Sequence, residues 1–220
     1  IGSIDVINNF PYQDIRDYYA KWYRPDLQGI VIVGDINVDE IEAKLKKVFA
    51  DVKAPVNPAE RIYYPVADNQ EPLIYIGTDK EVKNPSVNIF FKQDATPDSL
   101  KNTIAYYATS YMVSMAMNML NNRLNELRQT ANPPFTSAGA EYGEYFLAKT
   151  KEAFSISASS KIDGIDLATK TILEEAERAR RFGFTPTEYD RARANYLQAV
   201  ESAYNEREKT KSGSYVNEYV

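Results

Sequence analysis

The chain has 220 residues, which is enough for one large domain or two small ones. Its formal net charge of −5 argues against a dedicated nucleic-acid binder, because such proteins need a clustered positive field. It contains no cysteine and no histidine, which removes disulfides, thiolate and imidazole metal ligands, and the usual general base near neutral pH. No apolar run approaches the ~20 residues of a membrane-spanning helix.

The first predicted helix covers residues 12–23, where Ile15, Tyr18 and Trp22 recur at helical spacing. The next run, residues 29–33 (GIVIV), is apolar and rich in β-branched residues and therefore predicts a strand. A turn at Gly34-Asp35 follows. Asn37 is a predicted N-cap with Glu40 in the capping-box position, and the helix behind it carries one apolar stripe.

The middle of the chain opens with a proline-rich extended connector over residues 50–72. Two strands are predicted after it, at residues 73–76 and 86–92. A long helix is then expected to begin at Thr96-Pro97-Asp98, with Thr96 as its cap and proline in the first turn, and to end near Arg128.

Two further strands are predicted at roughly 135–148 and 152–159, and the second alternates apolar residues with serines. This alternation indicates a sheet that is covered on one side only. Of the two closing helices, the first stops at Phe182-Gly183 and the second begins at the capping box Thr185 to Glu188. The order of elements predicts a single α+β domain over residues 1–220, with a mostly antiparallel sheet covered on one face by helices.

Several local patterns have a functional and a structural interpretation. Gly34-Asp35 follows a strand, but it lacks the glycine-rich phosphate-binding patterns and stands beside acids, so a simple turn is favoured. Glu174, Glu175 and Glu177 lie on one helix, where adjacent positions point to different faces, and a solvated surface is therefore favoured over an acid–base pair. Arg128 at a helix C-terminus is favoured by the helix dipole, yet an arginine there also suits a peptide carbonyl or carboxylate.

Three stretches carry a family resemblance: DIRDYYAKWYRPDLQGIVIVGDINVDEIEAKLKKVF, NRLNELRQTANPPFTSAGAEYG and ERARRFGFTPTEYDRARANYL. In this order they resemble the pitrilysin (insulinase) family of zinc metallopeptidases. The resemblance implies that family's α/β roll and places the chain in the second, zinc-free domain, because the catalytic motif H-x-x-E-H needs histidine. It also implies that residues 1–220 are excised from a longer peptidase chain and have no catalytic activity on their own.

The function implied by the resemblance is that of a wall of a peptide-binding chamber, which supports catalysis carried out by a separate H-x-x-E-H domain. The implied partners are a peptide substrate and the catalytic domain of the same or a paired chain, and zinc is expected in that catalytic domain. Some family members place an arginine and, seven residues later, a tyrosine near the substrate. Arg128 matches the arginine, and Phe135 stands at the second position without the hydroxyl group.

Two other functions remain open. Some relatives in this family are inactive structural or partner subunits, and a parent protein without the zinc motif favours that role. The serines Ser155, Ser157 and Ser159 also allow an unrelated small-ligand module. The sequence assigns no compartment, although the absence of cysteine is compatible with a periplasmic or otherwise extracytoplasmic bacterial protein.

Overall fold

The structure, a computed structural model, describes residues 2–219. The chain divides into two compact units, which we describe separately. Unit 1 comprises the residues up to Ile62 and those from Ala203 onward, and unit 2 comprises Tyr63–Ser202. The expectation that residues 1–220 form one domain stays a prediction.

Unit 2 is built on a three-stranded sheet of order β1-β3-β2, in which both pairs are antiparallel. The strands are β1 (Ser86–Asp94), β2 (Ser137–Tyr145) and β3 (Ala148–Ser159). This confirms the predicted α+β class and its antiparallel sheet. The last two strands meet at a tight turn around Phe146, whose φ of 53° the sequence did not indicate, so their predicted boundaries were displaced.

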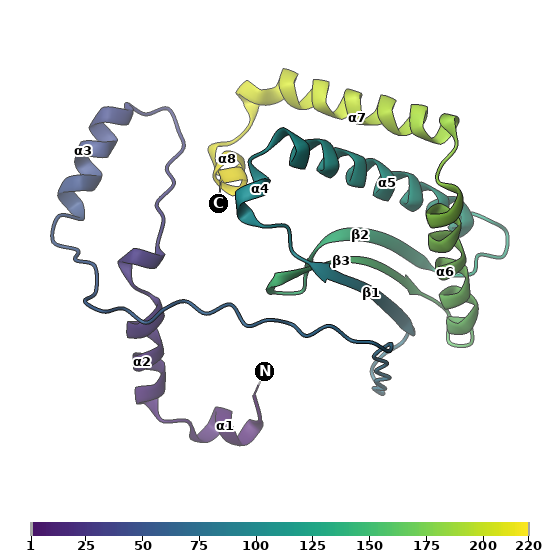
Figure 1. Cartoon of the computed structure of the whole chain (residues 1–220), viewed down its shortest axis with the longest axis horizontal. Coiled ribbons are helices and arrows are strands. Elements are labelled where there is room, and N and C mark those ends of the chain that lie inside the picture. Colours follow the sequence, from purple (N-terminus) through teal and green to yellow (C-terminus); the bar gives the residue numbers. More distant parts are fainter. Residues whose placement is uncertain (1, 220) are drawn as a thin grey trace. The chain divides into compact units, whose positions relative to one another are not determined.

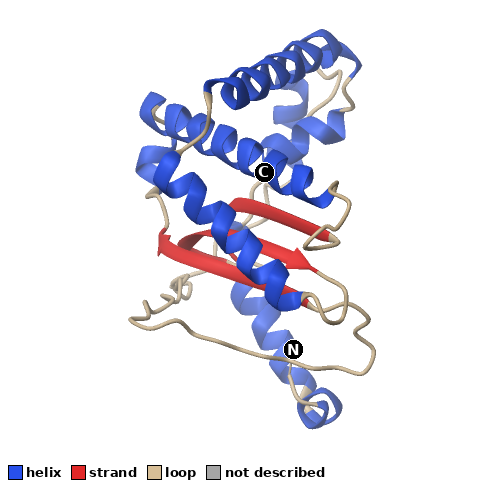
Figure 2. Cartoon of the chain, turned by 90° about the vertical axis from the view of Figure 1, so that its right-hand side faces the viewer, coloured by secondary structure: helices blue, strands red, loops and turns tan. Residues whose placement is uncertain are grey.

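Two helices, α5 (Ile104–Arg128) and α6 (Ile165–Phe182), lie over one face of this sheet (Figures 1 and 2). The apolar core lies between them and the strands and consists of Leu120, Leu124, Phe135, Ala140, Ile156, Ala158, Ala168 and Ile172. In β3 the predicted alternation is confirmed, because Ile156 and Ala158 are buried whereas Ser155, Ser157 and Ser159 are half-buried. The helices therefore cover the apolar side and leave the serine side uncovered.

The turn between α6 and α7 (Pro186–Glu206) has the predicted cap residues. Gly183 has a φ of 68°, a conformation that glycine adopts without strain. Glu188 donates its backbone N–H to the Thr185 hydroxyl at 3.3 Å, and its carboxylate accepts the Thr185 N–H at 2.7 Å. The capping box is thus confirmed, and it fixes where α7 begins.

The long helix predicted to start at Thr96 is two helices, α4 (Asp98–Lys101) and α5. Thr103 causes the break, since its hydroxyl accepts the Tyr106 N–H at 3.2 Å and donates to the Leu100 carbonyl at 2.7 Å. A side chain that ends one helix and caps the next prevents a continuous helix. The predicted end near Arg128 is confirmed.

Unit 1 contains short helices: α1 (Ile4–Asn9), α2 (Tyr12–Trp22), α3 (Val38–Val48), α8 (Ser212–Tyr219) and the 3-10 turns η1 (Pro25–Leu27) and η2 (Arg207–Lys209). The Asn37 side chain accepts the Glu40 N–H at 3.2 Å, which confirms the predicted N-cap of α3. None of the helices within residues 2–219 is long and apolar enough to traverse a lipid bilayer.

Two predicted strands are wrong. Residues 29–33 and 73–76 are irregular, and their side chains stand in solvent, with Ile30 56% and Ile74 83% exposed. A strand is defined by pairing with a neighbour, and in this structure neither run has a paired neighbour. These residue types do favour a strand, but whether the backbone forms one depends on a neighbour with which it can pair.

Candidate functional site

The serine side of the sheet, which we call the open sheet face, carries Asn88, Phe90, Gly139, Glu141, Ser155 and Ser157. The strand register aligns Asn88, Ser157 and Gly139 across the three strands, and Phe90, Ser155 and Glu141 in the next row. These residues line a shallow hollow of about 200 Å³. Short polar side chains and a glycine keep the hollow accessible to an extended chain.

One hydrogen bond is formed across this face, from the Ser155 hydroxyl to the Glu141 carboxylate at 3.2 Å. Asn88 and Glu141 are exposed, Ser155 and Ser157 are half-buried, and Phe90 is 38% exposed. The face thus offers amide, hydroxyl and carboxylate groups beside the Phe90 ring, which packs against Tyr145 and Phe146. Such a mixture suits the polar backbone and alternating side chains of a peptide.

A cleft of about 760 Å³ with mixed apolar and polar walls lies between α5 and the end of the sheet, and a carboxylate joins its polar groups. Glu152 accepts hydrogen bonds from the Tyr142 hydroxyl at 2.7 Å, the Thr96 N–H at 3.2 Å and the Thr96 hydroxyl at 3.3 Å. Gln93 donates to the Tyr142 oxygen. Burial, together with the Glu152 bond, raises the pKa of Tyr142 to about 12. Tyr142 is therefore a donor at neutral pH, and the group connects β1, β2 and β3 to the start of α4.

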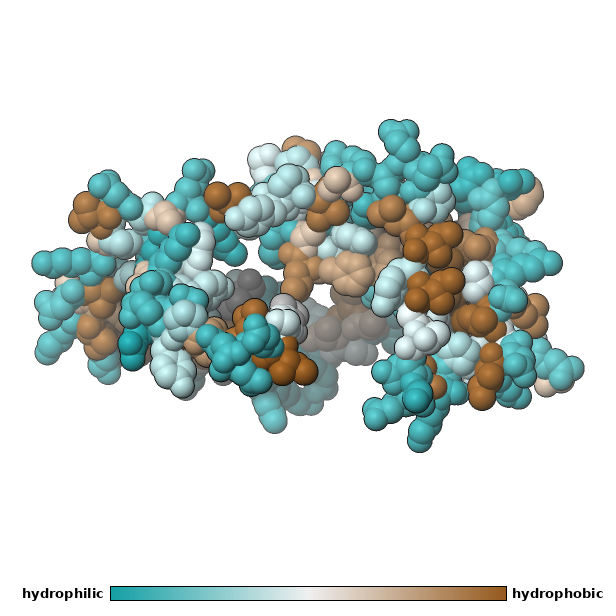
Figure 3. All heavy atoms as spheres, turned by 90° about the horizontal axis from the view of Figure 1, so that it is seen from below, coloured by the Kyte–Doolittle hydropathy of each residue, from teal (hydrophilic) through white to brown (hydrophobic). Residues whose placement is uncertain are grey.

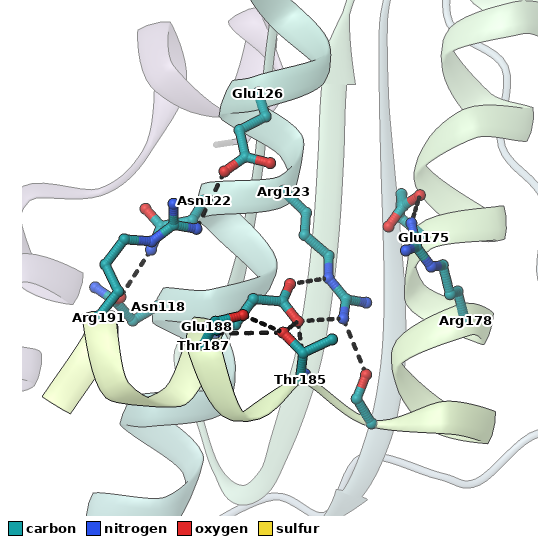
Figure 4. Close-up of polar contacts among 11 residues, drawn as sticks. Asn118, Asn122, Arg123, Glu126, Glu175, Arg178, Thr185, Thr187, Glu188 and Arg191 are labelled. Atoms are coloured by element: carbon teal, nitrogen blue, oxygen red, sulfur yellow. Dashed lines mark hydrogen bonds and ion pairs between the residues drawn. The ribbon is translucent and has the colours of Figure 1, made fainter.

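A largely buried ion pair joins α5 to the first turn of α7 (Figure 4). Arg123 Nε donates to Glu188 Oε1 at 2.5 Å, and its Nη2 donates to Glu188 Oε2 at 2.9 Å and to the Gly183 carbonyl at 3.0 Å. The guanidinium also lies 4.6 Å from the centre of the Phe184 ring. Chiefly because of the Arg123 bond, the pKa of Glu188 falls to about 2.

The Arg123–Glu188 pair has a positional role, because the bidentate geometry holds both partners and the Arg123 guanidinium lies over the Phe184 ring. Sequence reasoning assigned Glu188 only to its capping box and gave Arg123 no role. The available signal was the helical spacing that places Arg123 on the same side of α5 as Met119 and Leu120, since a buried arginine requires a partner. The partner lies 65 positions away in sequence, so spacing alone cannot identify it.

The two residues predicted to contact substrate lie in different environments. Arg128 is exposed at the end of α5, where its Nη2 donates to Asn125 Oδ1 at 2.8 Å. Phe135 is 2% exposed and belongs to the apolar core. In this structure only the guanidinium is accessible from solvent, and a substrate role for either residue stays a prediction.

Zinc, which the suspected family uses, does not fit the residues of this chain. With no histidine and no cysteine, only carboxylates remain as strong ligands. Across residues 2–219, no three carboxylates come close enough to share an ion. No metal-dependent step is therefore assigned to this chain.

Comparisons with known proteins agree with the fold. The "Zinc protease PQQL-like" of Arabidopsis thaliana is 26% identical over 221 residues, which is 100% of this chain but only 20% of that protein. The crystal structure of the periplasmic protease PqqL from Escherichia coli matches 98% of this chain with a TM-score of 0.76 and 18% identity, and 23% of that chain is covered. The first half of that protease, solved separately, matches with a TM-score of 0.74 and 18% identity over 97% of this chain and 44% of that one.

The chain therefore spans about a fifth of the length of the curated relative that it matches along its full length. The model of the peptidase M16 inactive domain matches residues 9–196, which is most of the chain and includes residues of both units. Resemblance in sequence, the α+β fold and this match lead to the same assignment. The chain belongs to the family of peptidase M16 inactive domains.

Proposed function

We propose that this chain forms part of the wall of a peptide-binding chamber in a zinc endopeptidase and that hydrolysis takes place on a separate domain carrying H-x-x-E-H. The observation that supports the proposal is that helices cover only one of the two faces of the sheet. Helices α5 and α6 cover the apolar face, while the open sheet face presents Asn88, Ser155 and Ser157 around a hollow.

An inactive domain contributes to proteolysis by holding substrate, and the open sheet face has suitable chemistry. A peptide in an extended conformation exposes N–H and C=O groups along its length, and these need partners once water is displaced. Hydroxyl and amide side chains act as donor and acceptor, so they accept many peptide sequences. This tolerance fits a wall better than a specific ligand pocket.

Arg128 is a secondary part of the proposal. Its guanidinium stands at the end of α5 in solvent, where it is able to approach a carbonyl or a carboxylate of a bound peptide. Phe135, in contrast, contributes through the core beneath the loop that follows α5. We also propose an extracytoplasmic location, by analogy with the periplasmic protease PqqL of Escherichia coli.

The proposal is tested by photo-cross-linking the whole chain to an extended peptide that bears photoreactive side chains. We expect labels on β1, β2 and β3 at the open sheet face. Ser157→Arg fills the hollow and should reduce labelling on the order of tenfold, as the loss of a moderate contact predicts. The matched control Ser202→Arg introduces the same side chain at an exposed position of α7 and should leave labelling unchanged.

Labels that gather on the outer surfaces of α6 and α7 would contradict the proposal, as would equal labelling of the two arginine variants. A chain that binds no peptide but associates tightly with an active peptidase subunit would instead favour the structural-partner function.

A further inference from the structure

The two free edges of the sheet differ. On the β2 edge, the Asn121 side-chain amide donates to the Ala140 carbonyl and accepts the Ala140 N–H, both at 2.8 Å. The amide takes the place of one residue of an additional strand. An extended chain cannot pair with the middle of β2 without displacing Asn121.

The β1 edge has no such closure. Ala95 N–H donates to the Thr150 carbonyl at 3.2 Å, and Ser160 N–H donates to the Pro85 carbonyl at 3.0 Å. With the strand register, these bonds show that the backbone N–H and C=O groups of the odd-numbered residues of β1 point toward β3. The backbone groups of the even-numbered residues, Ser86, Asn88, Phe90 and Lys92, therefore point away from the sheet. Within residues 2–219, no main-chain hydrogen bond from another segment reaches them.

The segment of unit 2 that precedes β1 runs past this edge in the opposite direction and is anchored at both ends (Figures 1 and 2). At one end, Lys92 Nζ donates to the Ala67 carbonyl at 2.9 Å, and Lys151 Nζ contacts Asp68 at 2.6 Å. At the other end the segment continues directly into β1 through Pro85. Residues 69–84 thus form a strap that leads from one end of β1 to the other and is tethered close to both ends of the strand.

The strap contains the wrongly predicted strand Leu73–Ile76, whose side chains are 81%, 83%, 84% and, for Tyr75, 92% exposed. Figure 3, a view of the molecule from below, shows that apolar side chains stand among the polar ones on that surface. A run that is apolar on both faces is typical of a strand inside a sheet. Exposure of four consecutive large apolar residues beside an unpaired strand edge is unfavourable in water.

The strap also contains the turn that a hairpin requires. Val82 N–H donates to the Asp79 carbonyl at 3.3 Å, and the Asp79 carboxylate accepts the Glu81 N–H at 2.7 Å. The chain therefore already reverses direction at residues 79–82.

We propose that Leu73–Ile76 closes onto the free edge of β1 as a fourth, antiparallel strand. Continued from the existing turn, the ladder pairs Tyr75 with Ser86 and Leu73 with Asn88, whose backbone groups are the ones facing the edge. Ile74 then lies beside Val87 on the helix-covered face. Pro72, which has no N–H, comes to the outer side of the new edge, where no donor is needed.

Closure of the strap makes the β1 edge unavailable to any other strand, and opening makes it available. The proposed partner of this edge is an extended apolar strand of the same chain, Leu73–Ile76. Asn121 ensures that the same strand does not pair with β2 instead.

The absence of cysteine allows a direct test by disulfide trapping in the whole chain. Ile74→Cys with Val87→Cys places two thiols on the same face in a closely spaced, non-hydrogen-bonded pair of the proposed ladder. The control, Tyr75→Cys with Val87→Cys, shifts one thiol to the opposite face. We expect the first pair to oxidise faster than the control on the order of tenfold or more, because thiols that point apart cannot bridge.

Equal oxidation rates in the two double variants would overturn the proposal, and so would disulfides that form only between molecules. Amide hydrogen exchange of the unsubstituted chain provides a second measurement. Closure predicts slowed exchange at Ser86 and Asn88 N–H, and exchange at the rate of an unstructured chain at both amides would overturn it.

Discussion

The two units use similar sequence patterns and reach different degrees of burial. In unit 2, the apolar residues Leu124, Ile156 and Ile172 are at most 1% exposed. In residues 2–62, Arg24 is the one residue in the buried class, while Ile15 and Tyr19 of α2 are 56% and 62% exposed. Helical periodicity is a local property that forms α2 and α3, but a core needs a second apolar surface that fits the first.

The largest expected effect is obtained by separating the two regions. Residues 63–206, which keep α7 whole, should unfold in urea in one cooperative transition, because they contain the sheet, α5 and α6. Residues 2–62 should show helical circular dichroism that fades gradually without a transition. A cooperative transition in the shorter fragment would remove the contrast between the units.

Substitution of a core residue should lower the free energy of unfolding of unit 2 far more than substitution of an exposed residue. Phe135→Ala deletes a ring that is 2% exposed and should lower the free energy of unfolding by about 3–5 kcal/mol. The matched Phe182→Ala, at 81% exposure, should change it by less than about 0.5 kcal/mol. Denaturant titration measures both free energies. A small loss for Phe135→Ala would contradict a core role for this residue.

The buried ion pair gives the next effect. Arg123→Met removes the main partner of the half-buried Glu188 carboxylate, which keeps its Thr185 bonds, and should cost about 1–3 kcal/mol of unfolding free energy. Arg191→Met breaks the exposed pair with Glu126, whose side chains are 54% and 63% exposed, and should cost about 1 kcal/mol or less. Similar losses in the two variants would show that burial does not strengthen the Arg123 pair.

Acid should reveal the same contact with a smaller effect. The pKa of Glu188 falls from its usual 4.5 to about 2 in the folded chain, so its stabilisation is complete above pH 4.5 and is lost as the pH falls toward 2. In Glu188→Gln this part of the decline in stability should disappear. The decline that remains in Glu188→Gln should come in part from Glu177, whose pKa Arg180 and Arg181 also lower to about 2, and acid titration of unfolding in Glu177→Gln separates the two shares.

The sequence predicted best the features that neighbouring residues determine. The Thr185 capping box, the Gly183 helix end and the alternation in β3 depend on residues within a few positions of one another, and all three are confirmed. The helix break at Thr103 was missed because Thr96-Pro97-Asp98 already has the residues of a helix start, and a second start a few residues later was not expected. Residues 29–33 and 73–76 have strand composition, but pairing depends on an edge that composition does not supply.

The site was less predictable than the fold for the same reason. The serine alternation indicated an uncovered face, yet the hollow exists because the register brings Gly139 and Asn88 to either side of Ser157. Arg123 and Glu188 meet only after α5 and α7 have packed. Contacts between distant segments are set by the tertiary arrangement, and a single sequence holds no direct record of them.

The central claim is that this inactive domain has no hydrolytic centre of its own. The most direct measurement is to incubate the 220-residue chain with zinc and a quenched fluorescent peptide and to follow both bound metal and cleavage. We expect no stoichiometric zinc and no cleavage above the protein-free rate. Turnover that survives repurification and is abolished by a chelator would contradict it.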